Sequence, residues 1–219
     1  MATKEISYPG LLISIEGIDG SGKSSLMDFL VKELAARDIN LLRTKESGGT
    51  EFGKQLHRIV QYRTEALDAK AEFCVFAADR AQHFTQVVIP GLEQGLLVIS
   101  DRMADSSIAY QGYGRQLDVS MIRQVNRWVM QGVTPDLTLL IDLDTSMAIA
   151  RLQDRPGNKT VFDREKIEFF ESVRLGFLTE LKNREHYVID GSQSRDAVAK
   201  DALQAVVKFI KKTGWSHVA

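Results

Sequence analysis

The stretch of sequence that decides the fold is Gly17-Ile18-Asp19-Gly20-Ser21-Gly22-Lys23-Ser24. It fits the phosphate-binding loop (P-loop) pattern G-x-x-x-x-G-K-[ST]. The apolar run before it, Leu11-Leu12-Ile13-Ser14-Ile15, predicts a buried strand. After the loop, apolar residues recur at helical spacing, at Leu26, Phe29, Leu30 and Leu34. A strand, a glycine-rich turn and the start of a helix together predict a cradle for phosphate groups.

The residue types in this loop suit the binding of a nucleoside triphosphate. Glycine lacks a Cβ atom, so the backbone N–H groups of the loop can converge on phosphate oxygens. We expect Lys23 to reach the β- and γ-phosphates and the Ser24 hydroxyl to bind Mg²⁺. The predicted ATP-binding segment runs from Gly17 to Ser25, where the expected helix begins. The competing interpretation, a glycine turn that matches by chance, is disfavoured by the flanking strand and helix.

Length and composition bound the possibilities further. The chain has 219 residues, of which 44% are hydrophobic, enough for one well-buried core but not for two ordinary domains. Its net charge of −1 gives no global attraction to nucleic acid or to an anionic membrane. The chain has one cysteine, Cys74, which cannot form an internal disulfide and so suits a reducing, cytoplasmic setting. Its apolar neighbours Phe73 and Val75 favour a packed thiol. No signal peptide and no membrane-spanning run are expected from the sequence.

Short apolar runs alternate with longer helical patterns, which indicates an α/β fold around a parallel sheet. The predicted strands cover residues 11–16, 41–44, 96–100, 137–143 and 187–190. The predicted helices cover residues 25–37, 52–62, 68–88, 120–131, 145–153, 164–183 and 195–212, with Pro90-Gly91 expected to end the third. The central strands are almost continuously apolar, which is typical of strands with helices on both faces.

Ligands of such sheets bind beyond the carboxyl ends of the strands. Asp101 and Arg102 directly follow the predicted strand over 96–100, so we expect both at this edge. A carboxylate there can hold Mg²⁺ through water, and a guanidinium can grip a phosphate with two parallel N–H donors. The alternative is structural: Asp101 would cap the next turn and Arg102 would form a surface ion pair.

A basic segment over residues 151–160 fits a packed domain poorly. It contains three cations and a Pro-Gly pair, with almost no apolar content. One interpretation is a solvated surface loop. The other is a mobile flap, over about 151–164, that closes over ATP and excludes water.

Four blocks of residues, in order along the chain, resemble the thymidylate kinase family. They are the P-loop at 17–24, Glu46-Ser47-Gly48-Gly49-Thr50, Phe76-Ala77-Ala78-Asp79-Arg80, and Asp101-Arg102 followed by Ala109-Tyr110-Gln111-Gly112. Many unrelated enzymes share the P-loop. The A-Y-Q-G block after D-R, with F-A-x-D-R upstream, narrows the choice to this family. With the basic flap and Asp163-Arg164-Glu165, the resemblance covers nearly the whole chain.

The resemblance implies a P-loop NTPase fold, a three-layer sandwich with a five-stranded parallel sheet, helices on both faces and a small flap. It implies a single domain over residues 1–219 that transfers the γ-phosphoryl group of ATP to dTMP with Mg²⁺. It also implies a cytoplasmic homodimer, with neither nucleic acid nor membrane as a partner.

The family's roles for the acceptor nucleotide carry over residue by residue. The resemblance implies that Asp19 accepts a hydrogen bond from the sugar 3′-OH and that Arg102 holds the acceptor phosphate. It implies that Phe76 stacks on thymine and that Arg80 donates to a ring carbonyl. An aromatic ring that stacks on the base and one guanidinium that donates to it are together sufficient to recognise a pyrimidine. Taken alone, Phe76 would more simply be a core residue; the flanking Asp79-Arg80 favours the stacking role.

Three further residues complete the implied acceptor site. Tyr110 would press on the deoxyribose where a 2′-OH needs space, which would exclude ribonucleotides. Ser107 would contact the base edge, and Gln111 would shape the same pocket. For Ser107 and Gln111, ordinary roles on a helix surface are an equal alternative.

Transfer between two phosphate chains needs a further cation beside Lys23, Mg²⁺ and Arg102. Some family members supply an arginine inside the P-loop, where this chain has Gly20, and others supply it from the flap. We therefore expect Arg151 or Arg155 to be catalytic. Arg155 adjoins Pro156-Gly157, a hinge-like pair that would allow it to swing inward.

The chain departs from the family pattern at three positions. Lys45 stands where the family often has arginine, which makes a bidentate contact there doubtful. Ser47 replaces a proline, and Met103, expected to pack internally, replaces a tyrosine or histidine.

Two other functions compete with this interpretation. A nucleoside kinase or a kinase for another monophosphate would share the P-loop and flap. A GTP-binding switch is disfavoured, since the Asn158-Lys159 pair precedes Thr160-Val161 instead of the x-Asp that reads guanine.

Overall fold

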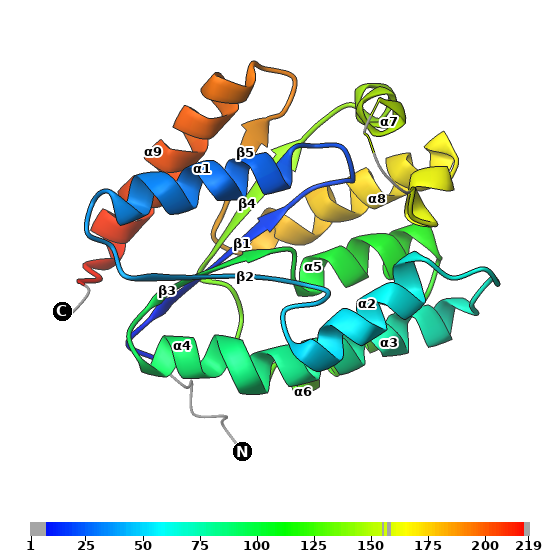
Figure 1. The fold of residues 1–219 in the computed structure, drawn as a ribbon, viewed down its shortest axis with the longest axis horizontal. Coiled ribbons are helices and arrows are strands. Elements are labelled where there is room, and N and C mark those ends of the chain that lie inside the picture. The colour runs from blue at the N-terminus through cyan, green and yellow to red at the C-terminus, as the bar shows by residue number, and fades with distance from the viewer. Residues whose placement is uncertain (1–7, 155, 157–158, 217–219) are drawn as a thin grey trace.

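A parallel sheet of five strands forms the centre of the protein (Figure 1). The structure is a computed structural model that describes residues 8–154, 156 and 159–216. The strands are β1 (Leu11–Glu16), β2 (Leu41–Lys45), β3 (Leu97–Asp101), β4 (Leu137–Asp142) and β5 (His186–Asp190), in the order β2-β3-β1-β4-β5. All pairs are parallel, with Ile13 of β1 opposite Ile99 of β3 and Leu137 of β4. The prediction of a five-stranded parallel sheet is confirmed, and every strand lies within one residue of its predicted bounds.

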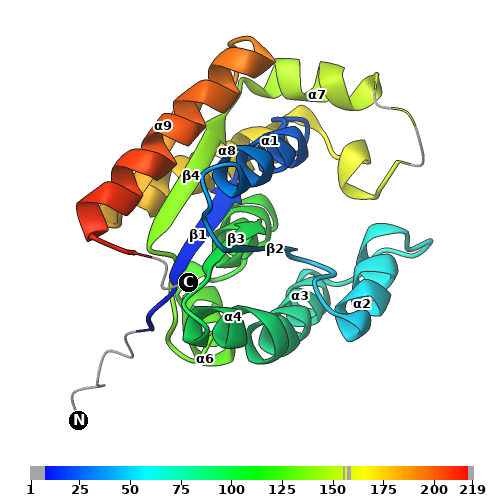
Figure 2. The ribbon, with the colours of Figure 1, turned by 60° about the vertical axis from the view of Figure 1, so that its left-hand side comes forward.

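Helices cover both faces of the sheet, as the continuously apolar strands predict. The α-helices are α1 (Lys23–Ala35), α2 (Glu51–Gln61), α3 (Ala69–His83), α4 (Ile89–Glu93), α5 (Ala104–Ser107), α6 (Val119–Val129), α7 (Thr145–Gln153), α8 (Ile167–Glu180) and α9 (Arg195–Thr213). Helices α1 and α9 lie on one side of the sheet and α4 and α6 on the other, in both views (Figures 1 and 2). The resulting three layers match the predicted sandwich.

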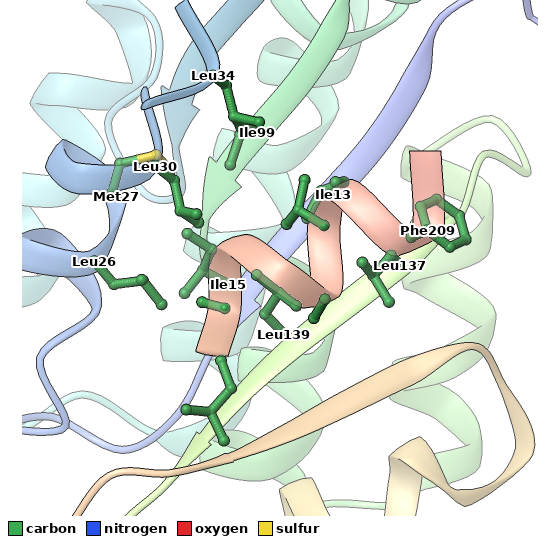
Figure 3. Close-up of a cluster of buried hydrophobic side chains, with 14 of the residues drawn as sticks. Ile13, Ile15, Leu26, Met27, Leu30, Leu34, Ile99, Leu137, Leu139 and Phe209 are labelled. Atoms are coloured by element: carbon green, nitrogen blue, oxygen red, sulfur yellow. The ribbon is translucent and has the colours of Figure 1, made fainter. Parts of the chain in front are cut away.

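Alternate residues of β1 belong to different cores. Ile13 and Ile15 are fully buried among side chains of α1 and α9, including Leu30 and Phe209 (Figure 3). Leu12, between them in the sequence, joins a second cluster with α4. A strand anchored on both faces fixes the direction in which the following P-loop leaves the sheet.

The third predicted helix does not end at Pro90. The helical run from α3 continues through a π-helix, η1 (Phe84–Val88), into α4, which extends to Glu93. Proline lacks the N–H that an α-helix needs, and here it sits in the first turn of α4, where that donor is dispensable. Gly91 lets this helix approach the sheet closely, since a Cβ atom there would lie 2.8 Å from Leu42.

Two further details differ from expectation. A second π-helix, η2 (Ile108–Gly114), follows α5 and had no counterpart among the predicted elements. The prediction that Cys74 is packed is wrong: it is exposed on α3, because Phe73 alone of its two neighbours turns fully into the core. Within the described part of the chain, no helix is long and apolar enough to span a bilayer.

Candidate active site

A large cleft of about 1070 Å³ opens at the carboxyl ends of the strands. Segments far apart in the sequence line it: the P-loop, the end of β2, helix α3, the end of β3, η2, the end of α7 and the start of α9. This is the edge where parallel α/β sheets bind ligands. The lining includes most of the predicted site residues, namely Asp19, Gly20, Ser21, Gly22, Lys23, Ser24, Ser25, Phe76, Arg80, Asp101, Arg102, Ser107, Tyr110, Gln111 and Arg151.

The P-loop turns tightly from β1 into α1. Gly17, Gly20 and Gly22 all have positive φ angles, a region that glycine adopts without steric cost. Lys23, the first residue of α1, folds back over the loop, and its Nζ donates to the carbonyls of Gly17 and Ile18 at 3.0 and 2.9 Å. Burial and the nearby Arg102 lower the pKa of Lys23 to about 8. A bound anion would favour the charged form of this lysine.

Ser24 and Asp101 lie together, as the sequence predicts. The Ser24 hydroxyl donates to Oδ2 of Asp101 at 3.2 Å, which joins the start of α1 to the end of β3. Mg²⁺ prefers oxygen ligands and takes only one or two from the protein when phosphates and waters supply the rest. This hydroxyl–carboxylate pair therefore fits a magnesium ion bound to a nucleotide.

Arg102 is the centre of a charged network. Its Nη2 donates to Asp19 Oδ1 at 2.5 Å and to the Tyr110 hydroxyl at 3.2 Å, while its Nη1 donates to the Gly17 carbonyl at 3.0 Å. The Tyr110 hydroxyl donates in turn to Asp19 Oδ2 at 2.9 Å. Burial alone would raise the pKa of Asp19, but Arg102 and Lys23 lower it to about 2. Asp19 is therefore ionised at neutral pH.

Tyr110 is held rigidly behind this network. Its ring contacts Phe162, Phe169 and Phe177 edge to face, with centroid separations of 5.8, 6.0 and 6.3 Å. The guanidinium of Arg102 lies 5.0 Å from the centroid of the same ring. Such packing leaves the tyrosine little freedom to yield to a bulkier ligand.

Phe76 and Phe162 form an aromatic wall of the cleft. Phe76 is half-buried on α3, and its ring lies 6.2 Å from that of Phe162. Phe162 begins the 3₁₀-helix η3 (Phe162–Arg164), which follows the basic segment. The partial exposure of Phe76 leaves its ring available to a ligand, unlike the core position that its apolar neighbours would suggest.

Arg80 is more deeply buried than a ligand-binding arginine usually is. It is only 2% exposed, and its Nε donates to Glu46 at 2.7 Å. Its Nη1 donates to Ser107 and Asn126, and its Nη2 to the Met103 carbonyl. Arginine has five N–H donors, so one Nη2 proton is left without an acceptor among the described residues.

Ser107 and Gln111 are buried inside the site, not displayed on a helix surface. Ser107 accepts from Arg80 at 3.1 Å. Gln111 donates to Glu72 at 3.0 Å. Both side chains thus support other residues of the pocket as well as lining the cleft.

The two candidate flap arginines differ in what the structure says of them. Arg151 lies in the last turn of α7, lines the cleft, and donates to the Gly191 carbonyl at 3.1 Å. Arg155 lies outside the described residues. Helix α7 packs directly on the P-loop, because a Cβ atom on Gly20 would lie 2.5 Å from the carbonyl oxygen of Ala148. No side chain fits at position 20 in this arrangement.

Comparison with known proteins agrees with this geometry. The family model described as thymidylate kinase matches residues 15–202. A thymidylate kinase of Halothermothrix orenii is 39% identical over 201 residues, covering 90% of this chain and 96% of that protein. The chain belongs to the thymidylate kinase family.

Further members support the assignment. A thymidylate kinase of an Exiguobacterium species is 38% identical over 94% of this chain and 98% of its own length. The crystal structure of thymidylate kinase from Ehrlichia chaffeensis superposes with a TM-score of 0.75 at 31% identity, over 90% of this chain and 98% of that chain.

The roles of three buried carboxylates in this thymidylate kinase-family site could not be assigned from the sequence, although Glu46 lies in one of the four family blocks. Glu16, Glu46 and Glu72 hold site residues in place. The sequence feature that could have indicated such a role is a carboxylate within or beside an apolar run, because a buried carboxylate needs a hydrogen-bond or ion-pair partner. The expectation that Met103 packs internally is confirmed: it is fully buried beside α4 and α6.

Proposed function

We propose that this protein transfers the γ-phosphoryl group of ATP to dTMP, giving ADP and dTDP. The observation that carries this proposal is the position of Lys23 and Arg102 at the centre of one cleft, within reach of the same carbonyl oxygen. Two polyanionic ligands repel one another, so a transferase must neutralise both where they meet. The membership of the thymidylate kinase family supports the choice of substrates.

Each residue has a task that its surroundings support. Lys23 binds the β- and γ-phosphates, and Arg102 orients the acceptor phosphate for in-line attack. Asp19 accepts the sugar 3′-OH with lone pairs that Arg102 and Tyr110 leave free. The tightly packed Tyr110 ring excludes a 2′-OH, and Phe76 stacks on the base.

The remaining acceptor contacts involve the buried network. Arg80 donates its free Nη2 proton to a ring carbonyl, Ser107 contacts the base edge, and Gln111 shapes the pocket. Ser24 and Asp101 would hold Mg²⁺, which when bound would supply positive charge against the phosphates. Arg151 or Arg155 supplies the last cation from the flap over about 151–164.

We also propose that the protein acts in the cytoplasm as a homodimer. Apolar side chains stand exposed on two helices that both pack against α3, with Trp128 of α6 79% exposed and Ile59 of α2 54% exposed. Light scattering of the purified protein tests the oligomeric state directly.

A coupled assay of ADP release tests the main proposal, with ATP and each of dTMP, dUMP, dCMP, dGMP and thymidine as acceptor. We expect dTMP to give the highest kcat/KM. Thymidine as the best acceptor would mean that Arg102 is not a phosphate anchor. Binding of GTP in preference to ATP, without transfer, would instead indicate a nucleotide-binding module.

A further inference from the structure

A buried carboxylate stands behind Arg102 and is not used by the proposed mechanism. Glu16, the last residue of β1, is fully buried and does not line the cleft. Its Oε1 accepts the backbone N–H of Met103 at 2.7 Å, and its Oε2 accepts the hydroxyl of Ser106 at 2.6 Å. Burial of an acidic group is costly unless hydrogen bonds compensate, and both of these bonds go to the segment that carries Arg102.

The backbone at Arg102 needs this support. Arg102 has a φ angle of +69°, a left-handed conformation that is unfavourable for any residue with a Cβ atom. On the β3 side the turn is closed by its own N–H, which donates to Ile15 at 2.9 Å. On the side toward α5, the hydrogen bond from the Met103 N–H to Glu16 closes the turn. The left-handed turn is what aims the Arg102 side chain at the P-loop.

The side chain of Arg102 is tied to the same carboxylate. Its Nη1 donates to the Ser106 hydroxyl at 2.9 Å, and that hydroxyl donates its own proton to Glu16. Because the Ser106 proton points at Glu16, the oxygen lone pairs of Ser106 face the guanidinium. Glu16 therefore acts on Arg102 twice, through the backbone of Met103 and through the hydroxyl of Ser106.

We propose that Glu16 is a positioning residue for the acceptor phosphate. It holds Arg102 in the orientation that grips this phosphate and does not touch the substrate itself. The inference rests on the proposed role of Arg102 in binding dTMP. If Glu16 has this role, the contribution of the phosphate group to dTMP affinity depends on a buried glutamate that acts through Arg102.

The test compares the affinities of dTMP and thymidine, which differ by the phosphate alone, using calorimetry on the full chain. For the parent we expect a strong preference for dTMP. In Glu16→Gln the preference should fall by about tenfold or more, since the NH2 group of the amide cannot accept the hydrogen bond that one of the two carboxyl oxygens of Glu16 accepts. Thymidine affinity should stay within about twofold, because base and sugar contacts are intact.

Three companion variants make the result decisive. Ser106→Ala removes only the side-chain link and should lower the dTMP preference in the same direction, and it serves if Glu16→Gln fails to fold. Glu180→Gln removes a buried carboxylate that binds Arg123 outside the cleft and should leave the preference unchanged. Arg102→Ala should abolish the preference.

The outcomes distinguish a failure of the inference about Glu16 from a failure of the proposed role of Arg102. If Arg102→Ala abolishes the preference while Glu16→Gln and Ser106→Ala keep the parental value, the inference about Glu16 is overturned and the phosphate anchor stands. If Arg102→Ala keeps the preference, the role of Arg102 in the proposed function is wrong, and the inference falls with it.

Discussion

Lys23 and Arg102 donate to the same acceptor, the carbonyl oxygen of Gly17, each at 3.0 Å. Two cations arranged around one carbonyl repel each other, and this proximity contributes to the low pKa of Lys23. The arrangement concentrates positive charge at the point where β1 gives way to the P-loop. An anionic ligand on either side of this point would relieve the repulsion, so the site is electrostatically prepared for two phosphate groups.

The two cations should have separable effects on catalysis. Lys23→Ala is expected to lower kcat by about 100-fold or more, because it removes a charged donor from the transferring group. Arg102→Ala is expected to raise the KM for dTMP as well as lowering kcat. Steady-state kinetics with each substrate varied in turn measures both effects. Turnover of Lys23→Ala at the parental rate would contradict the proposed mechanism.

Gly20 and α7 explain why the last cation should come from the flap. A side chain at position 20 would collide with the Ala148 carbonyl, and the same helix carries Arg151 into the cleft. We expect Arg151→Ala or Arg155→Ala to lower kcat about tenfold, or about 1.4 kcal/mol on the barrier. Rapid-quench measurement of single turnovers isolates this step. Arg37→Ala, which removes an exposed arginine in the turn after α1, is the control.

If neither flap substitution changes the single-turnover rate, the assignment of a flap cation is wrong. The charge of the transition state would then be met by Lys23, Arg102 and the metal alone.

The collision at Gly20 predicts a difference between two otherwise similar glycines. Gly20 and Gly132 have φ angles of +84° and +80°, but a Cβ atom on Gly132 meets nothing within 4 Å. Gly132→Ala should therefore cost only the left-handed strain, about 1 kcal/mol. Gly20→Ala should cost about 1–3 kcal/mol more, because the P-loop and α7 must separate. Urea denaturation of the two variants measures the difference, and equal losses would mean that α7 does not pack on the loop.

Much of this site could be predicted from local sequence motifs. The contacts that could not be predicted are polar contacts between residues far apart in the sequence. Lys23 and Arg102 could be placed because a P-loop and the end of a parallel strand have fixed positions in such sheets. The partners of Arg80 could not, since Glu46 lies 34 residues away, and Met103 lies 87 residues from Glu16. Sequence periodicity reports which face of an element is buried, but not which polar group meets which across the core.

The ionisation of Glu16 predicts an unusual pH dependence of stability. Burial and the neighbouring Asp105 raise the pKa of Glu16 to about 8, against 4.5 for the ordinary group. The folded state then keeps a proton that the unfolded state loses, so the contribution of Glu16 to stability is full below about pH 4.5 and is lost as the pH rises toward 8.

Glu16→Gln does not titrate at this position and provides the reference. The stability of the parent relative to Glu16→Gln should fall between pH 5 and pH 8, by at most about 1.4 kcal/mol per pH unit. Denaturant titrations at pH 5, 6.5 and 8 give the two curves. A constant difference across this range would show that Glu16 is already ionised at pH 5.

Removal of the Glu72 charge, which lies behind the residues that line the cleft, should be costly. Glu72 is almost fully buried and accepts from Arg63 Nη2 at 2.6 Å, Arg115 Nε at 3.2 Å and Gln111 at 3.0 Å. Both arginines also lie near the ring of Phe162, at 5.8 and 5.7 Å. Among the described residues, Glu72→Gln leaves the guanidinium of Arg63 without its carboxylate and leaves Arg115 with Glu165 alone, so we expect a loss of about 3 kcal/mol in the free energy of unfolding.

The control for this stability effect is Glu185→Gln, which breaks an exposed ion pair with Lys212 and should change stability little.

Because Glu72 also orients Gln111 and the arginines beside Phe162, we expect the folded Glu72→Gln protein to bind dTMP more weakly while its affinity for ATP is retained. Calorimetry below the unfolding temperature separates the two affinities. Equal weakening for both nucleotides would mean that Glu72 supports the whole cleft and not the acceptor side alone.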